Sequence, residues 1–448
     1  METLRNISPI DGRYRENVKK ISAYFSEYAL MKYRTFVEVE WLKFLLDKGI
    51  INASLNSEDL SGITNDFDDK DALKIKEFEA KTNHDVKAVE YYLRDRFKGS
   101  ELEQLDPYIH ILLTSDDTNS TAYGLMLKDA LDKVYYPELA KLIEKIEDKA
   151  RLYRDHAMLS HTHGQPATPT TVGKEFAIYA HRLKDLKRSM ITIIPRAKFS
   201  GTVGNYNAHK IAYPKYDWPL LCRNFIESLG LEYNPLTTQI EPHDHLCLQL
   251  SYIKIINNII RDLDGDMWSY ISRSYFREKI KEGETGSSIM PHKVNPINYE
   301  NSIANTQIAN GLIDTLVDNL SVSRMQRDLS DSSKMRNIGV ILSHCLVSIQ
   351  QTIKGLDKLV IDDDTIKKDL DANWNVIAEA IQTVMRKNGI ADAYEQLRDL
   401  SRGKEMSKED IQRFIADLPL PLDDKQRLID LTPEKYTGLA SLIIDQNN

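Results

Sequence analysis

Residues 286–296, which read GSSIMPHKVNP, combine the residue types that an elimination reaction next to a carboxylate requires. Gly286 and the two serines after it let the backbone move or bind an anion, whereas Pro291 and Pro296 restrict it. Lys293 places a cation between the two prolines. Such a reaction needs a base, a positive charge that meets the developing negative charge, and a cover that excludes water. The segment could supply all three, although a flexible loop that only binds phosphate is a simpler interpretation.

A histidine-containing segment at residues 160–170, SHTHGQPATPT, could supply the complementary acid. A nitrogen that leaves carbon must gain a proton, and histidine titrates close enough to neutrality to donate one. His163 is the candidate, with Pro166 and Pro169 stiffening the turn around it. His161 could suggest a metal pair with His163, but no third ligand of suitable spacing stands nearby in the sequence. For an arbitrary loop histidine, a surface or structural role would be the simpler interpretation.

Motifs that run through almost the whole chain resemble those of the fumarase/aspartase superfamily. Residues 286–296 match the signature of this superfamily over their whole length. The other motifs resemble, within the superfamily, the adenylosuccinate lyase family in its longer bacterial-type form. They are SPIDGRY at residues 8–14, TNHDVKAVEY at 82–91, THGQPAT at 162–168, VGNYNAH at 203–209 and TTQIEPHD at 237–244.

The resemblance implies a carbon–nitrogen lyase of purine biosynthesis, acting in the routes to AMP and IMP. Members of the family eliminate fumarate from adenylosuccinate, which gives AMP, and from succinyl-aminoimidazole-carboxamide ribotide, which gives the carboxamide ribotide. The expected small-molecule partners are therefore these succinyl nucleotides, AMP and fumarate. The resemblance also implies that no cofactor and no metal is needed, and that the protein is a homotetramer whose sites are shared between subunits.

The resemblance assigns catalytic roles to two residues. His163 is expected to protonate the leaving nitrogen as the general acid, and Ser287 to remove the proton from carbon as the base. A free hydroxyl is a poor base at neutral pH, so the ionisation of Ser287 must depend on nearby backbone N–H groups and on Lys293. Choosing Ser287 over Ser288 rests on the resemblance alone.

A succinyl nucleotide presents one phosphate and two carboxylates, so several cations and hydroxyl groups must converge on it. Arginine offers the bidentate geometry that both anions favour, although a single arginine is ordinarily a solvated surface residue. From the matching positions, the expected substrate-binding residues are Arg13, Tyr14, Asn83, His84, Asp85, Thr114, Ser115, Gln239, Lys293, Asn295, Asn301, Arg327, Ser332 and Arg336.

Two short polar motifs also have structural interpretations. In the first, residues 82–85 (TNHD), Asp85 could accept a hydrogen bond from a histidine and orient that histidine toward an anion. Asn83 or Asp85 could also cap the helix that follows. In the second, residues 243–245 read HDH and could suggest a metal site. They begin a long amphipathic helix, so helix capping with Asp244 in the first turn is the preferred interpretation.

Composition indicates a mostly helical, cytoplasmic protein. The 448 residues carry 59 Lys and Arg against 67 Asp and Glu, and this net charge of -8 disfavours nonspecific binding to nucleic acid or membrane surfaces. Glycine and proline are few, whereas Leu, Ile, Lys, Asp and Glu dominate, which favours helix. Cys222, Cys247 and Cys345 are far apart without metal-site spacing, and no apolar run of about 18 residues occurs.

Apolar periodicity predicts an all-α fold with a central bundle of long helices that assembles into a tetramer core. Helices are predicted at residues 22–48, 71–97 with a break near Asn83, 116–155, 171–194, 243–278, 296–320, 364–388 and 391–402. The segments 160–170, 200–210 and 282–296 are predicted loops between them. Three helical domains are expected, at residues 1–111, 112–362 and 363–448.

Two other functions remain possible on the sequence alone. One is a different fumarate-releasing lyase of the superfamily, of the argininosuccinate or aspartate type. Such an enzyme would share residues 286–296 but would have a different substrate pocket. The other is a helical scaffold or storage protein that kept the fold and lost activity, against which the presence of Ser287, Lys293 and His163 argues.

Overall fold

The computed structural model describes residues 2–279, 290, 293–401 and 406–446. The described chain forms two compact units, each built from several segments. The first unit contains Met1–Leu139, Leu186–Asn258 and Ala304–Gln350, and the second contains Ala140–Asp185, Ile259–Ile303 and Gln351–Asn448. Helices dominate both units, as the all-α prediction requires.

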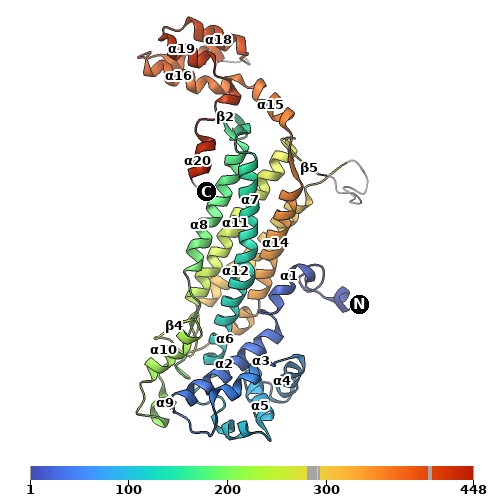
Figure 1. The fold of residues 1–448 in the computed structure, drawn as a ribbon, viewed down its shortest axis with the longest axis vertical. Coiled ribbons are helices and arrows are strands. Elements are labelled where there is room, and N and C mark those ends of the chain that lie inside the picture. The colour runs from blue at the N-terminus through green and yellow to red at the C-terminus, as the bar shows by residue number, and fades with distance from the viewer. Residues whose placement is uncertain (1, 280–289, 291–292, 402–405, 447–448) are drawn as a thin grey trace. The chain divides into compact units, whose positions relative to one another are not determined.

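Most helices and strands are labelled in Figure 1, and each can be assigned to one of the two units from its residue numbers. Those of the first unit are α1 (Arg15–Ser22), α2 (Glu27–Asp47), α3 (Ser61–Asn65), α4 (Asp69–Thr82), α5 (Asp85–Phe97), α6 (Ser115–Ala130), β3 (Arg196–Ala197), α9 (Asn207–Ala212), α10 (Trp218–Ser228), β4 (Glu232–Tyr233) and α13 (Ser330–Met335). Those of the second are β1 (Ala157–Thr162), β2 (Gln165–Thr171), β5 (Phe276–Glu278), β6 (Leu359–Ile361), α15 (Asp363–Ala372), α16 (Ala378–Lys387), α17 (Ala393–Ser401), α18 (Lys408–Asp417), α19 (Leu422–Ile429) and α20 (Ala440–Gln446). The division falls within α7 (Tyr136–Leu152), α8 (Val172–Ile191), α11 (Asp244–Ser272), α12 (Ile297–Leu320) and α14 (Ile338–Lys358).

The predicted long helices agree with α8, α11, α12 and the pair α6 and α7. A short π-helical segment, Leu131–Tyr135, lies between α6 and α7. In the first unit, Asn257 of α11 donates to Asn310 of α12 at 2.9 Å and to the sulfur of Cys345 of α14 at 3.3 Å. Polar contacts therefore fix how these three helices pack. Among the described residues, no helix is both long and apolar enough to cross a bilayer.

The first unit has an aromatic core around α2. The indole of Trp41 lies 4.8 Å from the ring of Phe199 and 5.1 Å from that of Phe225, measured between ring centroids. Its Nε1–H donates to the carbonyl of Ile111 at 3.0 Å. The helix ends before Gly49, whose φ of +62° suits a glycine at the end of a helix. Helices α4 and α5 pack against each other and against α2 (Figure 1).

The segment 160–170 is a β-hairpin, so its prediction as a loop was wrong. Strands β1 and β2 pair antiparallel, with Thr162 opposite Gln165. His163 and Gly164 form the two-residue connection, and both have positive φ, +54° and +75°. Two such residues match the turn whose twist suits a tight hairpin. Further strand pairs, β3 with β4 and β5 with β6, are short.

The C-terminal helices α16–α19 of the second unit enclose an apolar cluster that includes Trp374, Ile381, Ile411 and Ile415. Helices α15, α16 and α17 correspond to the predicted helices 364–388 and 391–402, with a break around Asn373. The proposed domain boundaries near residues 111 and 362 stay a prediction.

The partly buried His110 pairs with the buried Glu38, and this pair should make stability depend on pH. His110 Nδ1 lies 2.7 Å from Glu38 Oε1, which also accepts from the hydroxyl of Thr118 at 2.7 Å. Burial opposes the charge on His110, but Glu38, Glu90 and Asp117 together outweigh it and raise the pKa of His110 from 6.5 to about 9. His110 therefore binds its proton more tightly in the folded state than in the unfolded state. The stabilisation that protonated His110 contributes is complete below pH 6.5 and is lost as pH rises toward 9.

We therefore expect His110→Gln to destabilise the protein most at low pH, by on the order of 3 kcal/mol, with the difference from wild type shrinking between pH 6.5 and 9. Urea unfolding at a series of pH values measures this difference. His181→Gln, at an exposed position on α8, serves as the control. A difference that is independent of pH would contradict the assignment.

Candidate active site

The start of α6 is held by a buried ion pair. Thr114 and Ser115, both predicted to bind substrate, lie directly before α6 and at its first residue. The backbone N–H of Thr114 donates to Asp117 Oδ2 at 2.8 Å, and Lys198 Nζ lies 2.8 Å from Asp117 Oδ1. Both charged side chains are fully buried, and Lys198 also donates to the carbonyl of Gly201 at 2.6 Å. The pair thereby fixes the loop after residue 200 beside the first turn of α6.

Breaking this pair should be costly because it leaves a buried charge without its partner. We expect Lys198→Met to lower the free energy of unfolding by about 3–5 kcal/mol. Replacement of the exposed Lys215 by methionine should change it by less than about 0.5 kcal/mol. Urea unfolding of the two variants measures both values, and equal effects would show that the buried pair contributes nothing specific.

Arg327, Gln239 and Ser332 come together, as the substrate-binding prediction expects. Arg327 Nη1 lies 3.5 Å from Gln239 Oε1 and 3.6 Å from Asp116 Oδ1, and its Nη2 lies 3.5 Å from Ser332 Oγ. Each of these contacts is longer than an ordinary charged hydrogen bond. The guanidinium is therefore oriented by its neighbours without using its full donor strength on them, which suits a group that meets an anion.

Arg336 and Asp85 also meet, but within a network of opposite charges. Arg336 pairs with Glu27, and its Nη2 lies 3.2 Å from Asp85 Oδ2. Asp85 Oδ2 is 2.8 Å from Arg34 Nη2, and Arg34 Nε donates to Asn119 at 2.8 Å. Burial opposes ionisation of Asp85, but the two arginines outweigh it and hold the pKa of Asp85 below its ordinary value. Arg336 is thus more strongly engaged with protein carboxylates than Arg327.

Helix α5 is capped by His84, so the predicted cap by Asn83 or Asp85 was wrong. Asn83 has φ +51° and ends α4 in the left-handed region. The imidazole Nδ1 of His84 accepts from the backbone N–H of Lys87 at 3.2 Å, and Asp85 is the first residue of the helix. The suggested histidine–aspartate pair is loose, with 3.9 Å between Nδ1 and Asp85 Oδ1, because Asp85 is directed to the arginines.

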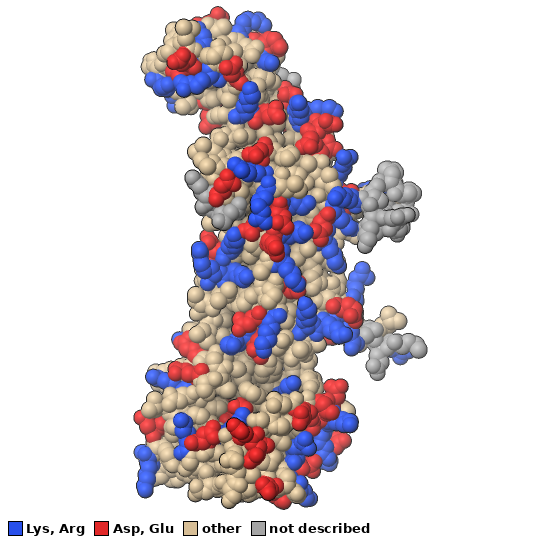
Figure 2. Space-filling model, in the orientation of Figure 1, with Lys and Arg blue, Asp and Glu red and all other residues tan. Residues whose placement is uncertain are grey.

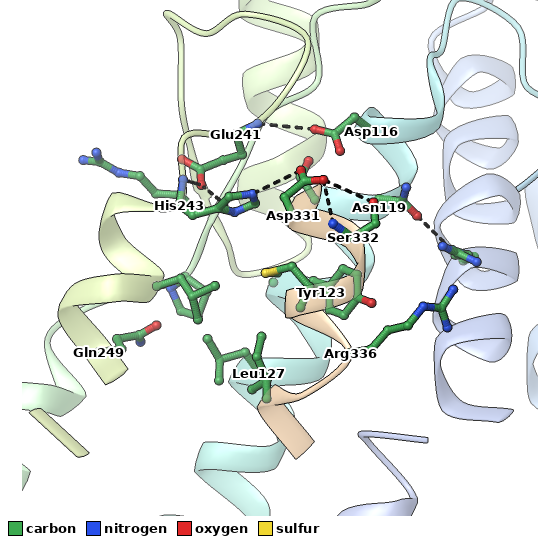
Figure 3. Close-up of a pocket in the computed structure, with 18 residues that line it drawn as sticks. Asp116, Asn119, Tyr123, Leu127, Glu241, His243, Gln249, Asp331, Ser332 and Arg336 are labelled. Atoms are coloured by element: carbon green, nitrogen blue, oxygen red, sulfur yellow. Dashed lines mark hydrogen bonds and ion pairs between the residues drawn. The ribbon is translucent and has the colours of Figure 1, made fainter. Parts of the chain in front are cut away.

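Arg13 and Tyr14 lie just before α1. Arg13 is exposed, and Tyr14 packs against an apolar cluster of Ile10, Val18 and Val347. Neither is among the described residues that line the pocket of Figure 3. Their role in binding substrate stays a prediction.

In the second unit, His163 occupies the exposed turn of the β1–β2 hairpin. The hairpin is anchored by Glu379, whose Oε2 accepts from the hydroxyls of Thr168 at 2.8 Å and Tyr436 at 3.2 Å. The Nε2 atom of His161, a residue of β1, lies 2.6 Å from Nη1 of Arg273.

Residues of the signature segment are described only in part. Ser287 lies outside the described residues, so its role as base stays a prediction. Lys293 is exposed and donates its backbone N–H to the carbonyl of Met290 at 3.0 Å. Asn295 lies just before α12, and Asn301 lies in its second turn. The roles of Lys293, Asn295 and Asn301 likewise remain expectations.

A small pocket of about 50 Å³ in the first unit lies beside Ser332 and Arg336 and opens to solvent. Asp116, Glu241, His243 and Asp331 lie along one side, and Leu127 lies on the other (Figure 3). Sequence reasoning missed this charged wall. Two features of the sequence could have indicated it. One is the polar start of α6, where residues 116–118 are buried in the structure. The other is residue 243 before α11, where helix capping was expected.

On the face drawn in Figure 2, lysine and arginine side chains are interspersed with aspartate and glutamate. Among the described residues, that face therefore carries no broad basic surface that would attract anions by itself.

Two family models match the chain. The model described as "Lyase" matches residues 12–310, and the model described as "Adenylosuccinate lyase C-terminal" matches residues 323–437. Relatives named adenylosuccinate lyase from Legionella pneumophila (strain Corby) and Escherichia coli (strain K12) are 48% and 44% identical to the chain. These alignments cover 99% and 100% of this chain and 99% of each relative.

Solved structures show the same fold at lower identity. A fumarate lyase from Mesorhizobium sp. BNC1 has a TM-score of 0.78 at 17% identity, covering 96% of this chain and 97% of that chain. The 3-carboxy-cis,cis-muconate lactonizing enzyme from Pseudomonas putida has a TM-score of 0.74 at 20% identity, covering 96% of both chains. These likenesses establish a shared helical architecture.

Proposed function

The chain belongs to the adenylosuccinate lyase family, and on that premise we propose that it eliminates fumarate from adenylosuccinate to give AMP. By the same reaction it converts succinyl-aminoimidazole-carboxamide ribotide to the carboxamide ribotide. The observation in the site that carries this proposal is the group formed by Arg327, Gln239 and Ser332, where a loosely held guanidinium and a hydroxyl face the same region. Such donors suit the phosphate or carboxylate of a succinyl nucleotide. We place the reaction in the cytoplasm.

The proposed reaction breaks one C–H and one C–N bond and forms one C=C bond. The Ser287 alkoxide takes the proton from the carbon beside the succinyl carboxylate. Lys293 and Asn295 meet the negative charge that develops on that carboxylate. His163 gives a proton to the nitrogen of the nucleotide as the C–N bond breaks, so that fumarate and the free amine leave.

We further propose a homotetramer in which His163 and Ser287 of one site come from different subunits. Long helices of this chain expose large apolar side chains that would be covered in an assembly. On α11, Leu248 and Ile255 are 46% and 47% exposed, and on α12 Ile308 is 50% exposed. The spacing of seven residues on α11 places the first two on one helix face, as an interface between helices requires.

Release of fumarate tests the proposed activity. Purified protein mixed with adenylosuccinate, or with the succinyl ribotide, should produce fumarate and the corresponding amine, followed by ultraviolet absorbance and chromatography. Argininosuccinate and aspartate serve as control substrates, and AMP should inhibit the reaction because it is a product. Turnover of neither succinyl nucleotide would reject the proposal.

A further inference from the structure

His243 links two segments of the first unit that are distant in sequence. It precedes α11 with φ +64°, and its backbone N–H donates to Glu241 Oε2 at 2.7 Å. Its ring lies between two carboxylates, with Nδ1 3.7 Å from Glu241 Oε2 and Nε2 3.7 Å from Asp331 Oδ2 (Figure 3). A left-handed backbone at a histidine is uncommon and is retained where the surroundings hold it in place.

Asp116 joins these residues to Arg327. Its Oδ2 accepts from the backbone N–H of Glu241 at 3.3 Å, and its Oδ1 lies 3.6 Å from Arg327 Nη1. Asp331 accepts from the backbone N–H of Ser332 at 2.6 Å, while Ser332 Oγ lies 3.5 Å from Arg327 Nη2. Asp116, Glu241, His243 and Asp331, called here the His243 cluster, are each at least nine-tenths buried.

The charges of the His243 cluster determine what Arg327 can do. Three carboxylates lie around protonated His243 and Arg327, and burial raises the pKa of one of them, Asp116, to about 6 against the attraction of His243, Arg327 and Lys198. With a neutral side chain at position 243, Asp331 and Asp116 would depend more on Arg327, because buried carboxylates need a charged or hydrogen-bonding partner. Glu241 would keep the hydrogen bond from Asn234 at 3.0 Å. With His243 charged, Asp331 and Glu241 are compensated and Arg327 keeps only long contacts to its neighbours.

We propose that His243 is a positioning residue which, by compensating Asp331 and Glu241, keeps Arg327 and Ser332 directed toward the anionic group of the substrate. This inference rests on the proposed function. The electrostatic surroundings support it. Burial alone would lower the pKa of His243, but Asp331, Glu241 and Asp116 outweigh it and raise that pKa. Burial alone would raise the pKa of Asp331, but His243, Arg327 and the backbone N–H of Ser332 outweigh it and hold that pKa below its ordinary value.

A double-mutant cycle between His243 and Arg327 tests the proposal. We expect His243→Gln to raise KM for adenylosuccinate and the inhibition constant of AMP about tenfold, with kcat within about threefold of wild type. Arg327→Met should raise both constants by about 100-fold. In the Arg327→Met background, His243→Gln should change them by less than about threefold, because its effect is transmitted through Arg327.

Two further variants complete the test. His245→Gln alters the neighbouring, more exposed histidine of the same motif and should leave KM unchanged. If His243→Gln does not fold, Asp331→Asn replaces it, since asparagine keeps the acceptor for the N–H of Ser332 and removes the charge that faces His243. Asp331→Asn should raise KM for adenylosuccinate by about the same factor as His243→Gln.

The outcomes separate the two proposals. If wild type releases fumarate but neither His243→Gln nor Asp331→Asn changes KM, the positioning role is wrong and the proposed function stands. Equal effects of His243→Gln on KM in wild type and in the Arg327→Met background would also overturn the positioning role, because they would indicate a general structural contribution. If wild type turns over neither succinyl nucleotide, the proposed function is wrong and this inference falls with it.

Discussion

Replacing His163 with asparagine is expected to lower kcat by about 10²–10⁴-fold while leaving the hairpin folded, because the variant loses the proposed proton donor. Asparagine is the right substitution at this position. His163 has φ +54°, and asparagine tolerates the left-handed region better than most residues. The turnover number for adenylosuccinate and the thermal unfolding curve, measured on the same preparation, check the prediction. His181→Asn, at an exposed position on α8, is the matched control.

A role as proton donor also predicts chemical rescue. Imidazole added to His163→Asn should restore part of the turnover, since a small acid can reach an exposed turn, and a merely structural histidine would show no such effect. The anchors of the hairpin, from Thr168 and Tyr436 to Glu379, do not involve His163. Full activity of His163→Asn would remove this residue from the mechanism.

Helices could be predicted from the sequence because their signals are local. The apolar positions of α2 recur at helical spacing, Gly49 ends that helix, and Asn83 separates α4 from α5. The hairpin at residues 160–170 was missed because Pro166 and Pro169 look like loop residues. Both lie on β2, and a two-stranded sheet has only edge strands, where proline is tolerated.

The candidate site was only partly predictable. Gln239, Arg327 and Ser332 lie close together, as expected of residues that were predicted to bind one substrate, and that role stays a prediction. The His243 cluster was missed because its partners are far apart in sequence, and nothing local distinguishes a buried aspartate such as Asp116 from a helix cap. The pairing of Asp85 with Arg34 instead of His84 depends in the same way on a contact across the fold.

Subunits that lack different catalytic groups are expected to restore activity to each other. Ser287→Ala removes the proposed base and His163→Asn the proposed acid, so each variant alone should be nearly inactive. If the two groups of one site come from different subunits, random exchange in an equal mixture makes roughly a quarter of the sites intact. The mixture should therefore regain roughly a quarter of wild-type turnover.

This complementation separates shared sites from sites within one subunit. If His163 and Ser287 of one site belonged to the same chain, every site in the mixture would carry one defect and turnover would stay at the level of the single variants. Subunit exchange is verified by native mass spectrometry with one variant isotopically labelled, and wild type mixed with Ser287→Ala gives the reference for dilution. Labelled mixed tetramers without recovered turnover would contradict the shared site, because the intact combinations would then be present and still inactive.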